Sequence, residues 1–211
     1  MLKHTLTRWI VVAICVLIAV SYGYHLLQSQ PVVDNSLPVY GQKNDDSTDH
    51  TIADWKLTDQ DGHIMTQDSL KDHIYVADFF FATCQGICPK MGVQMQRVYE
   101  RFKGDMRVHF LSHTVKPWED SVSVLKSYAD LHGADSKQWH FVTGDKQQIY
   151  QLARKSYLVD VSGKSTGPDD FVHTQFFTLI DGDRRIRGFY DGTDSTDVDK
   201  LIKDMLNLIT E

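Results

Sequence analysis

Apolar residues divide the chain into three stretches of different character. Residues 9–27 are apolar and carry no formal charge if His25 is neutral, whereas residues 28–50 are polar and contain two prolines. From residue 51 onward, apolar residues recur with the periods of strands and helices. The pattern predicts an apolar N-terminal segment, a linker over residues 28–50 and one folded domain over residues 51–211.

The domain shows an alternation of strand and helix patterns. Residues 53–70 predict a hairpin around an Asp-Gly turn, and residues 73–81 form the nearly continuous apolar run of a strand buried on both faces. A second hairpin is expected over residues 173–192, followed by a helix over residues 195–210. Helices and strands alternate between the hairpins, at 89–101, 106–115, 119–133, 139–144 and 145–157. This order predicts an α/β fold with an N-terminal β-hairpin and a mixed central sheet.

The apolar segment is long enough to cross a membrane as one helix. A spanning helix needs about 20 residues, and residues 9–27 supply 19. Lys3 and Arg8 precede this segment, whereas the first acidic residue is Asp34. Because basic residues favour the cytoplasmic side, we expect residues 1–8 in the cytoplasm and the domain on the opposite side.

A cleaved signal peptide is the alternative for the same segment, since Ala19-Val20-Ser21 has small residues where such a signal is cut. Both interpretations export the domain. We favour an uncleaved single transmembrane anchor, because the apolar stretch has the full length of a spanning helix. The expected location is a bacterial inner (cell) membrane with the C-terminal domain in the periplasm, and a mitochondrial inner membrane is the alternative.

The charge of the domain argues against nucleic-acid binding. Lys3 and Arg8 are the only charged residues among the first 33, so the remainder carries 20 of the 22 basic residues and all 28 acidic ones. An acidic domain without a basic stripe is a poor binder of phosphate backbones. We therefore expect no nucleic-acid partner.

Two of the three cysteines lie in the exported domain and are separated by three residues. Cys84 and Cys88 follow the strand predicted over residues 73–81 and precede Pro89, which suits the first turn of a helix. A disulfide across so short a loop adds little stability, so the spacing indicates chemistry. Thiols next to a helix N-terminus ionise more readily. The pair could form a reversible disulfide or bind a soft metal ion.

A metal ion would need further ligands, and the histidines are the candidates. Zinc takes four ligands, commonly Cys and His, whereas Cu(I) selects thiolate and thioether. His173 follows a loop rich in Gly, Ser and Asp and directly precedes an apolar strand, so that loop could carry it over the cysteines. The other candidates are His109, His113, His132 and His140.

Two segments together resemble the SCO/SenC family of copper-handling proteins. They are FFFATCQGICPKM and, much later, FVHTQFFTLIDGDRRIRGFYDG, and the resemblance extends over residues 51–210. The family motif is C-x-x-x-C-P with a distant histidine ahead of a strand, and Cys84, Cys88 and His173 occupy these positions. The resemblance implies a membrane-anchored thioredoxin-like fold that binds copper, as Cu(I) or Cu(II), through these three residues.

The resemblance also implies two linked activities. One is that of a metallochaperone, which delivers copper to the dinuclear copper site of cytochrome c oxidase; its partner would be the copper-site subunit or another copper chaperone. The other is reduction of the recipient's cysteines by Cys84 and Cys88 as a redox-active pair, which leaves open whether the protein is an enzyme.

One segment departs from the family, because Lys116 stands where many relatives carry an aspartate, while Asp120 keeps a later acidic position. A lysine there could meet the negative charge of the thiolates.

Two alternative functions use the same thiols. A thiol-disulfide oxidoreductase of the thioredoxin/peroxiredoxin type would normally carry C-x-x-C, and the loop here holds one more residue. Thioredoxin-like enzymes also place a proline opposite the cysteines, where this chain reads Val172-His173-Thr174. A redox or copper sensor is the second alternative, because the fold alone does not decide the function.

Overall fold

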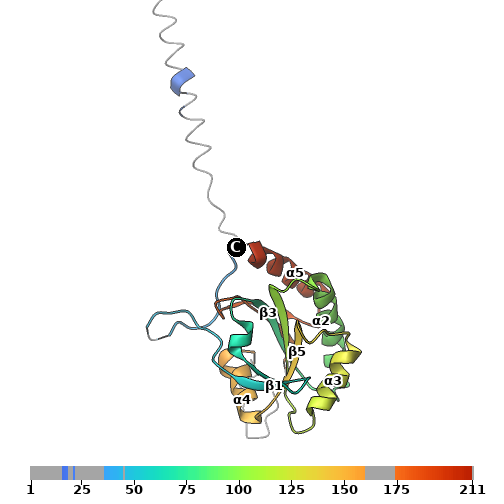
Figure 1. Cartoon of the computed structure of the whole chain (residues 1–211). Helices are drawn as coiled ribbons and strands as arrows, with labels where there is room; N and C mark the ends of the chain where they lie inside the picture. Colours follow the sequence, from blue (N-terminus) through green and yellow to red (C-terminus); the bar gives the residue numbers. More distant parts are fainter. Residues whose placement is uncertain (1–15, 19–20, 22–35, 45, 160–173, 211) are drawn as a thin grey trace, which may run out of the picture. The chain divides into compact units, whose positions relative to one another are not determined.

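The protein divides into two units, Met1–Asn35 and Ser36–Glu211, and the second is the folded domain (Figure 1). The computed structural model describes residues 16–18, 21, 36–44, 46–159 and 174–210. Within these residues, no helix is both long and apolar enough to cross a membrane. Residues 1–8 and most of the anchor expected over residues 9–27 lie outside the described residues, so both assignments stay predictions.

A mixed seven-stranded sheet forms the centre of the domain, in the order β2-β1-β5-β4-β3-β6-β7 (Figure 1). Strands β3, β4 and β5 are parallel, and the hairpins β1–β2 and β6–β7 add antiparallel strands at the two edges. This arrangement confirms the predicted mixed sheet with its N-terminal hairpin. The strands are β1 (Lys56–Asp59), β2 (Ile64–Thr66), β3 (Ile74–Phe80), β4 (Val108–Thr114), β5 (Trp139–Thr143), β6 (Phe176–Ile180) and β7 (Ile186–Asp191).

Helices cover both faces of the sheet. Helices α2, α3 and α5 pack on one face, and α4 with the helical turn that follows it packs on the other (Figure 1). Two helices begin where the sequence supplies a capping side chain, because Ser121 accepts from the Val124 N–H at 3.4 Å and Asp145 accepts from the Gln148 N–H at 2.8 Å. The four helices predicted for the domain are all found, as α2 (Cys88–Phe102), α3 (Val122–Leu131), α4 (Lys146–Gln151, continued by a π-helical turn, Leu152–Ser156) and α5 (Ser195–Thr210).

Alternate side chains of β3 enter two separate hydrophobic cores. Val76 and Phe80 pack under α2, α3 and α5, whereas Tyr75, Ala77 and Phe79 pack on the α4 side. A strand with helices on both faces must be apolar at nearly every position. This explains the unbroken apolar run in the sequence and makes β3 the strand around which the domain is built.

Part of the segment predicted as a linker packs with the domain. The N–H of Tyr40 donates to the Ile186 carbonyl at 2.9 Å and so extends the sheet beyond β7. The guanidinium group of Arg187 donates to the Leu37 carbonyl at 2.7 and 3.2 Å. The compact unit accordingly begins at Ser36, while residues 28–35 lie outside the described part of the chain.

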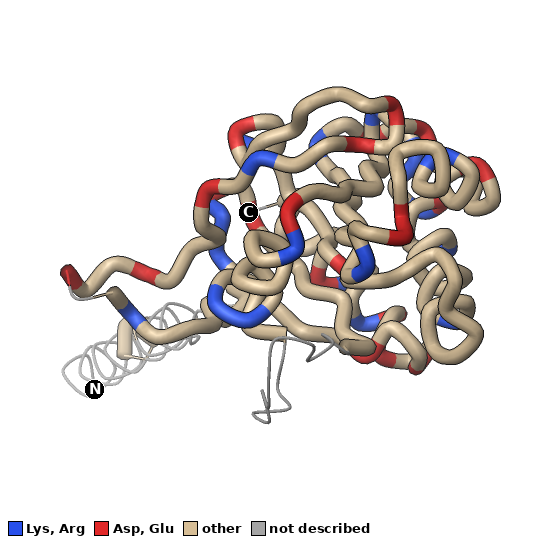
Figure 2. Tube along the Cα trace, turned by 90° about the horizontal axis from the view of Figure 1, so that it is seen from below, with Lys and Arg blue, Asp and Glu red and all other residues tan. Residues whose placement is uncertain are grey.

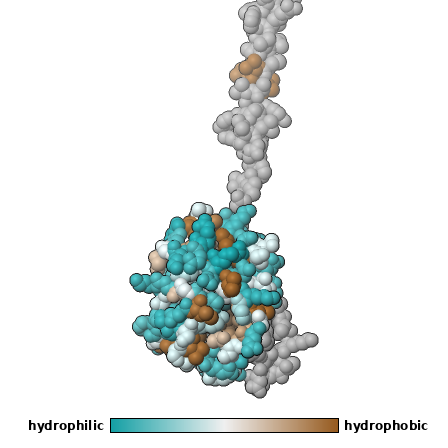
Figure 3. Space-filling model, turned by 90° about the vertical axis from the view of Figure 1, so that its right-hand side faces the viewer, coloured by the Kyte–Doolittle hydropathy of each residue, from teal (hydrophilic) through white to brown (hydrophobic). Residues whose placement is uncertain are grey.

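The domain surface is polar and mixed in charge. Figure 2 shows basic residues interspersed with acidic ones along the trace, without a continuous basic stripe over the described residues. Figure 3 shows one face of the domain, where apolar side chains form small, separate patches among hydrophilic ones. A surface of this kind offers no extended apolar face on the side that Figure 3 shows.

His113 on β4 is fully buried on the α4 side of the sheet. Its ring stacks on Phe79 with 4.8 Å between ring centroids and meets the edge of Tyr157 at 5.2 Å. Burial lowers the pKa of His113 to about 3. The imidazole is therefore neutral in the folded domain near neutral pH and acts as a core aromatic residue.

We predict that His113 makes the domain sensitive to acid. The pKa of His113 is about 3 in the folded domain, whereas the ordinary value for histidine is 6.5. The contribution of the neutral ring to the unfolding free energy is therefore complete above pH 6.5 and is lost as the pH falls toward 3. At about pH 4.5 this residue would cost roughly 2–3 kcal/mol of unfolding free energy. Chemical denaturation of wild type and His113→Phe at neutral and acidic pH measures the effect. The variant should lose less stability in acid than the wild type. Equal losses would contradict the assignment of this acid sensitivity to His113.

Candidate functional site

The two cysteines lie where β3 passes into α2. Cys84 is in the segment of residues 81–87, which we call the cysteine loop, and Cys88 follows this loop directly. β3 ends at Phe80, and the N–H of Cys84 donates to the Phe81 carbonyl at 3.2 Å to close a turn. Cys88 is the first residue of α2, with Ile87 as the N-cap and a proline directly after it. Both thiols are thus at the carboxyl end of the central parallel strand, where sites of open α/β sheets occur.

The two thiols are free and have different environments. Cys84 is half-buried, whereas Cys88 is only 5% exposed. Burial alone would raise the pKa of Cys84, but hydrogen bonds from the Cys88 thiol and from the backbone N–H groups of Cys88, Gly86 and Ile87 lower it below its ordinary value. Burial, together with the hydrogen bond to Cys84, raises the pKa of Cys88 to about 12. Cys84 is therefore the thiol that ionises, and Cys88 retains its proton.

A buried carboxyl group lies in the sheet below the cysteines. Asp78 on β3 is 5% exposed, and it accepts a hydrogen bond from the Ser112 hydroxyl at 2.5 Å, which in turn accepts from Trp139 Nε1 at 3.0 Å. Burial raises the pKa of Asp78 to about 7. When Asp78 is ionised, its negative charge further raises the pKa of Cys88. The environment of Cys88 thus disfavours a lone thiolate.

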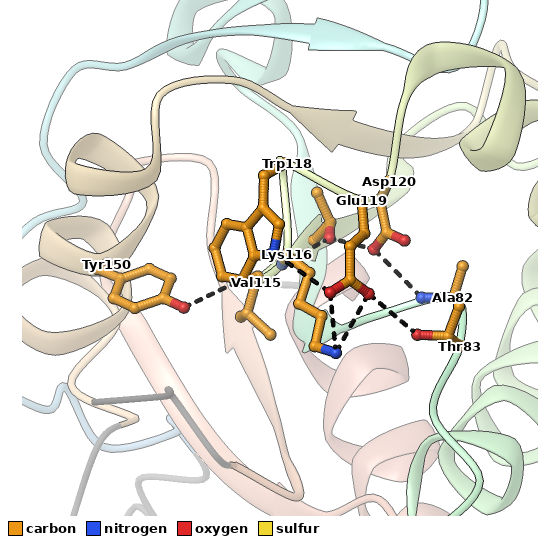
Figure 4. A network of polar contacts seen from close by, with 9 residues as sticks. Ala82, Thr83, Val115, Lys116, Trp118, Glu119, Asp120 and Tyr150 are labelled. Carbon is orange, nitrogen blue, oxygen red and sulfur yellow. Dashed lines mark hydrogen bonds and ion pairs between the residues drawn. The ribbon is translucent and has the colours of Figure 1, made fainter. Parts of the chain in front are cut away.

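The loop between β4 and α3, residues 115–121, braces the cysteine loop (Figure 4). Asp120 in this β4–α3 loop is fully buried, and its Oδ2 accepts from the Ala82 N–H at 3.2 Å and from the Thr114 hydroxyl. Glu119 accepts from the Thr83 hydroxyl at 3.4 Å. Burial raises the pKa of Asp120. These contacts fix the two residues that precede the first cysteine to the end of the neighbouring strand.

Lys116 belongs to the same polar network (Figure 4). Its Nζ lies 3.2 Å from Glu119 Oε2 and 4.6 Å from the centroid of the Phe81 ring. The lysine at this position therefore ties the β4–α3 loop to the first residue of the cysteine loop. The expectation that Lys116 faces the thiolates stays a prediction.

The histidines considered as third ligands are separated by the fold. His109 and His140 stack on each other with 5.8 Å between ring centroids, His113 is in the α4-side core, and His132 follows the end of α3. Over the residues that the structure describes, no three His, Cys, Asp or Glu side chains are arranged to hold a metal ion. His173 lies outside the described residues, so its role as a ligand stays a prediction.

Two acids of this site are hard to recognise from the sequence. Asp78 stands alone in a run otherwise made of apolar residues, and a single acid in a strand expected to be buried on both faces is the signal that could have identified it. In the sequence, Asp120 is recognisable only as an acidic position. Its contact with Ala82 depends on the approach of two loops 38 residues apart, which periodicity does not reveal.

A dithiol between a central strand and a helix, in a mixed α/β sheet, defines the domain as thioredoxin-like. The chain belongs to the SCO1/SenC family, because the family model of that description matches residues 43–210. It is also 30% identical over 172 residues to the SCO1 protein homolog of Bacillus subtilis (strain 168), covering 81% of this chain and 89% of that relative.

Solved structures agree with this assignment. BsSco, a member of the Sco family of cytochrome c oxidase assembly proteins, is 29% identical with a TM-score of 0.65, over 76% of this chain and 94% of that one. ScoI of Bradyrhizobium japonicum, solved with copper bound, is 23% identical with a TM-score of 0.59, over 75% of this chain and 99% of that one. The similarity to ScoI shows a shared fold and nothing further. Together they confirm the expected thioredoxin-like architecture.

We predict that Cys84 is alkylated before Cys88, because it is more exposed and its pKa is lower. A pulse of iodoacetamide on the reduced full-length protein, followed by peptide mass spectrometry, should label Cys84 about tenfold or more faster. Cys88→Ser should keep the fast reaction, and Cys84→Ser should lose it. Faster labelling of Cys88 in the wild type would reverse the assignment.

Asp120→Ala should loosen the cysteine loop, since it leaves the Ala82 N–H and the Thr114 hydroxyl without their buried acceptor. We expect a loss of about 1–3 kcal/mol in unfolding free energy, together with a changed pH profile for Cys84 alkylation. The matched control is Asp130→Ala, which removes a carboxylate from an exposed ion pair with Lys126 and should change stability by well under about 1 kcal/mol. Equal behaviour of the two variants would argue against the bracing role.

Proposed function

We propose that the protein is a membrane-anchored copper chaperone that binds copper through Cys84, Cys88 and His173. It would deliver the metal to the dinuclear copper site of cytochrome c oxidase, with the copper-site subunit or another copper chaperone as its partner. The observation that carries the proposal is the free dithiol between β3 and α2 in a chain of the SCO1/SenC family. Two similar proteins support it, since BsSco belongs to a family of cytochrome c oxidase assembly proteins and ScoI was solved with copper bound.

The chemistry of the dithiol suits a soft metal ion. Thiolate ligands select Cu(I) over harder cations, and hydrogen bonds already favour the thiolate of Cys84. Cys88 keeps its proton when no metal is bound, because its pKa is about 12. Metal binding must displace that proton, so we expect it to release protons and to weaken in acid.

The topology supports His173 as the third ligand. β6 runs antiparallel to β3, with Ala77 paired to Thr178, so the chain enters β6 from the end of the sheet where β3 meets the cysteine loop. Thr174, the first described residue of this stretch, is 7% exposed. An imidazole as third ligand would complete a two-sulfur, one-nitrogen set.

The same thiols could reduce the recipient's cysteines. The Cys84 thiolate would attack the recipient disulfide and form a mixed disulfide, with one recipient sulfur leaving as a thiolate. Cys88 would then give up its proton and attack Cys84, which releases the second recipient thiol and leaves a Cys84–Cys88 disulfide. The different environments of the two thiols support this order of attack. A general thioredoxin-type oxidoreductase is not favoured, because the family match is to SCO1/SenC.

The membrane anchor and the export of the domain rest on the sequence. The anchor of residues 9–27 follows Lys3 and Arg8 and lacks formal charge. This distribution supports a single-pass protein of the bacterial inner membrane with its domain in the periplasm. An exported domain would face the side on which a periplasmic copper site of an oxidase is assembled.

We predict one copper ion per chain for the reduced full-length protein in detergent. Cys84→Ser, Cys88→Ser and His173→Ala should each weaken binding by about a hundredfold or more, since each removes one of three ligands. The matched control is His63→Ala, which removes a histidine exposed on the β1–β2 hairpin and should bind copper as the wild type does. Titration with Cu(I) against a competing chelator measures the affinities. Unchanged binding by His173→Ala would contradict the three-ligand site.

A further inference from the structure

Trp118 is an exposed tryptophan at the edge of the dithiol site. Trp55 and Trp139 are 3% and 1% exposed, whereas Trp118 in the β4–α3 loop is 55% exposed. Single exposed apolar residues are common on protein surfaces. The distinguishing feature of Trp118 is its position, because its loop follows a strand parallel to β3 and so emerges at the same end of the sheet as the cysteine loop.

The indole ring is held in place by its neighbours (Figure 4). Its Nε1 donates to Glu119 Oε1 at 3.2 Å. Lys146 Nζ lies 4.8 Å from the ring centroid. The loop itself is fixed, since the Tyr150 hydroxyl donates to the Val115 carbonyl at 2.8 Å. A side chain that is already ordered loses little conformational entropy when a partner binds it.

The carboxylate of Glu119 connects the ring to Thr83, the residue before the reactive thiol. Glu119 accepts from Trp118 through one carboxylate oxygen and from the Thr83 hydroxyl through the other, at 3.2 and 3.4 Å. Thr83 directly precedes Cys84 and is exposed, as is Gln85 on the other side of this cysteine. A polypeptide whose sulfur reaches Cys84 must cover these residues and would lie beside the indole.

We propose that Trp118 is a docking residue for the partner protein and binds an apolar side chain next to the partner's cysteines. The proposal rests on the proposed function, which requires a partner thiol to reach Cys84. Tryptophan is enriched among the residues that carry most of the energy of protein interfaces. The occupant is thus a thiol-bearing segment with an apolar flank, not a free metal ion or a small thiol.

Thiol-disulfide exchange with defined probes tests the proposal. The reduced full-length protein in detergent is mixed with a synthetic Cys-x-x-x-Cys peptide, closed by its disulfide and flanked by leucines. The two protein thiols become a disulfide and the peptide disulfide becomes two thiols, so no further oxidant is needed. A serine-flanked peptide and a small hydrophilic disulfide serve as probes without an apolar flank.

Trp118→Ala should slow exchange with the leucine-flanked peptide about tenfold and leave the other two probes unchanged. Trp118→Phe should restore most of the rate. The matched control is Met106→Ala, because Met106 is 48% exposed but precedes β4 at the opposite end of the sheet, and its rates should equal those of the wild type.

Wild-type rates for Trp118→Ala with the leucine-flanked peptide would overturn the docking role while leaving the copper-binding proposal intact. Equal slowing with all three probes would also overturn it, because the change would then act on the thiols themselves. Copper titration of the same variant separates the two proposals, since Trp118→Ala is expected to bind the metal as the wild type does.

Discussion

The burial of Cys88 in the first turn of α2 is the constraint on which the chemistry of this protein depends. A helix N-terminus normally favours a thiolate, but here the cost of burying the charge is larger, and the pKa of Cys88 rises to about 12. Cys84, half-buried in the cysteine loop, has hydrogen bonds that favour its thiolate. One backbone turn thus presents one reactive sulfur and one protonated sulfur. A cation that binds both sulfurs would favour the thiolate of Cys88 as well as that of Cys84. After Cys84 has attacked a disulfide, Cys88 would likewise have to give up its proton.

Two neighbouring elements maintain this arrangement. β3 supplies Asp78 beneath the pair, where the ionised carboxylate works against a lone thiolate at Cys88. The β4–α3 loop supplies Asp120, which fixes the start of the cysteine loop through the Ala82 N–H. The same loop presents Trp118 toward solvent. Positioning of the thiols and contact with a partner therefore depend on one short segment that neighbours the cysteine loop.

The sequence was sufficient to predict the order of strands and helices and the place of the dithiol. The apolar run of β3 and the Cys-x-x-x-Cys-Pro that follows it are local signals, since strand burial and helix start depend on adjacent residues. The environment of the site could not be predicted in the same way. Asp78 meets Ser112 only through the β3–β4 register, and Tyr40 joins β7 from a segment that is polar and rich in turns. Contacts between distant segments leave no periodic trace in a single sequence.

The most direct test of the account is X-ray absorption at the copper edge of the copper-loaded full-length protein. Two sulfur neighbours and one nitrogen neighbour are expected, with the nitrogen signal lost when His173 is replaced by alanine. A copper ion surrounded only by oxygen and nitrogen atoms would contradict the central role of the two cysteines.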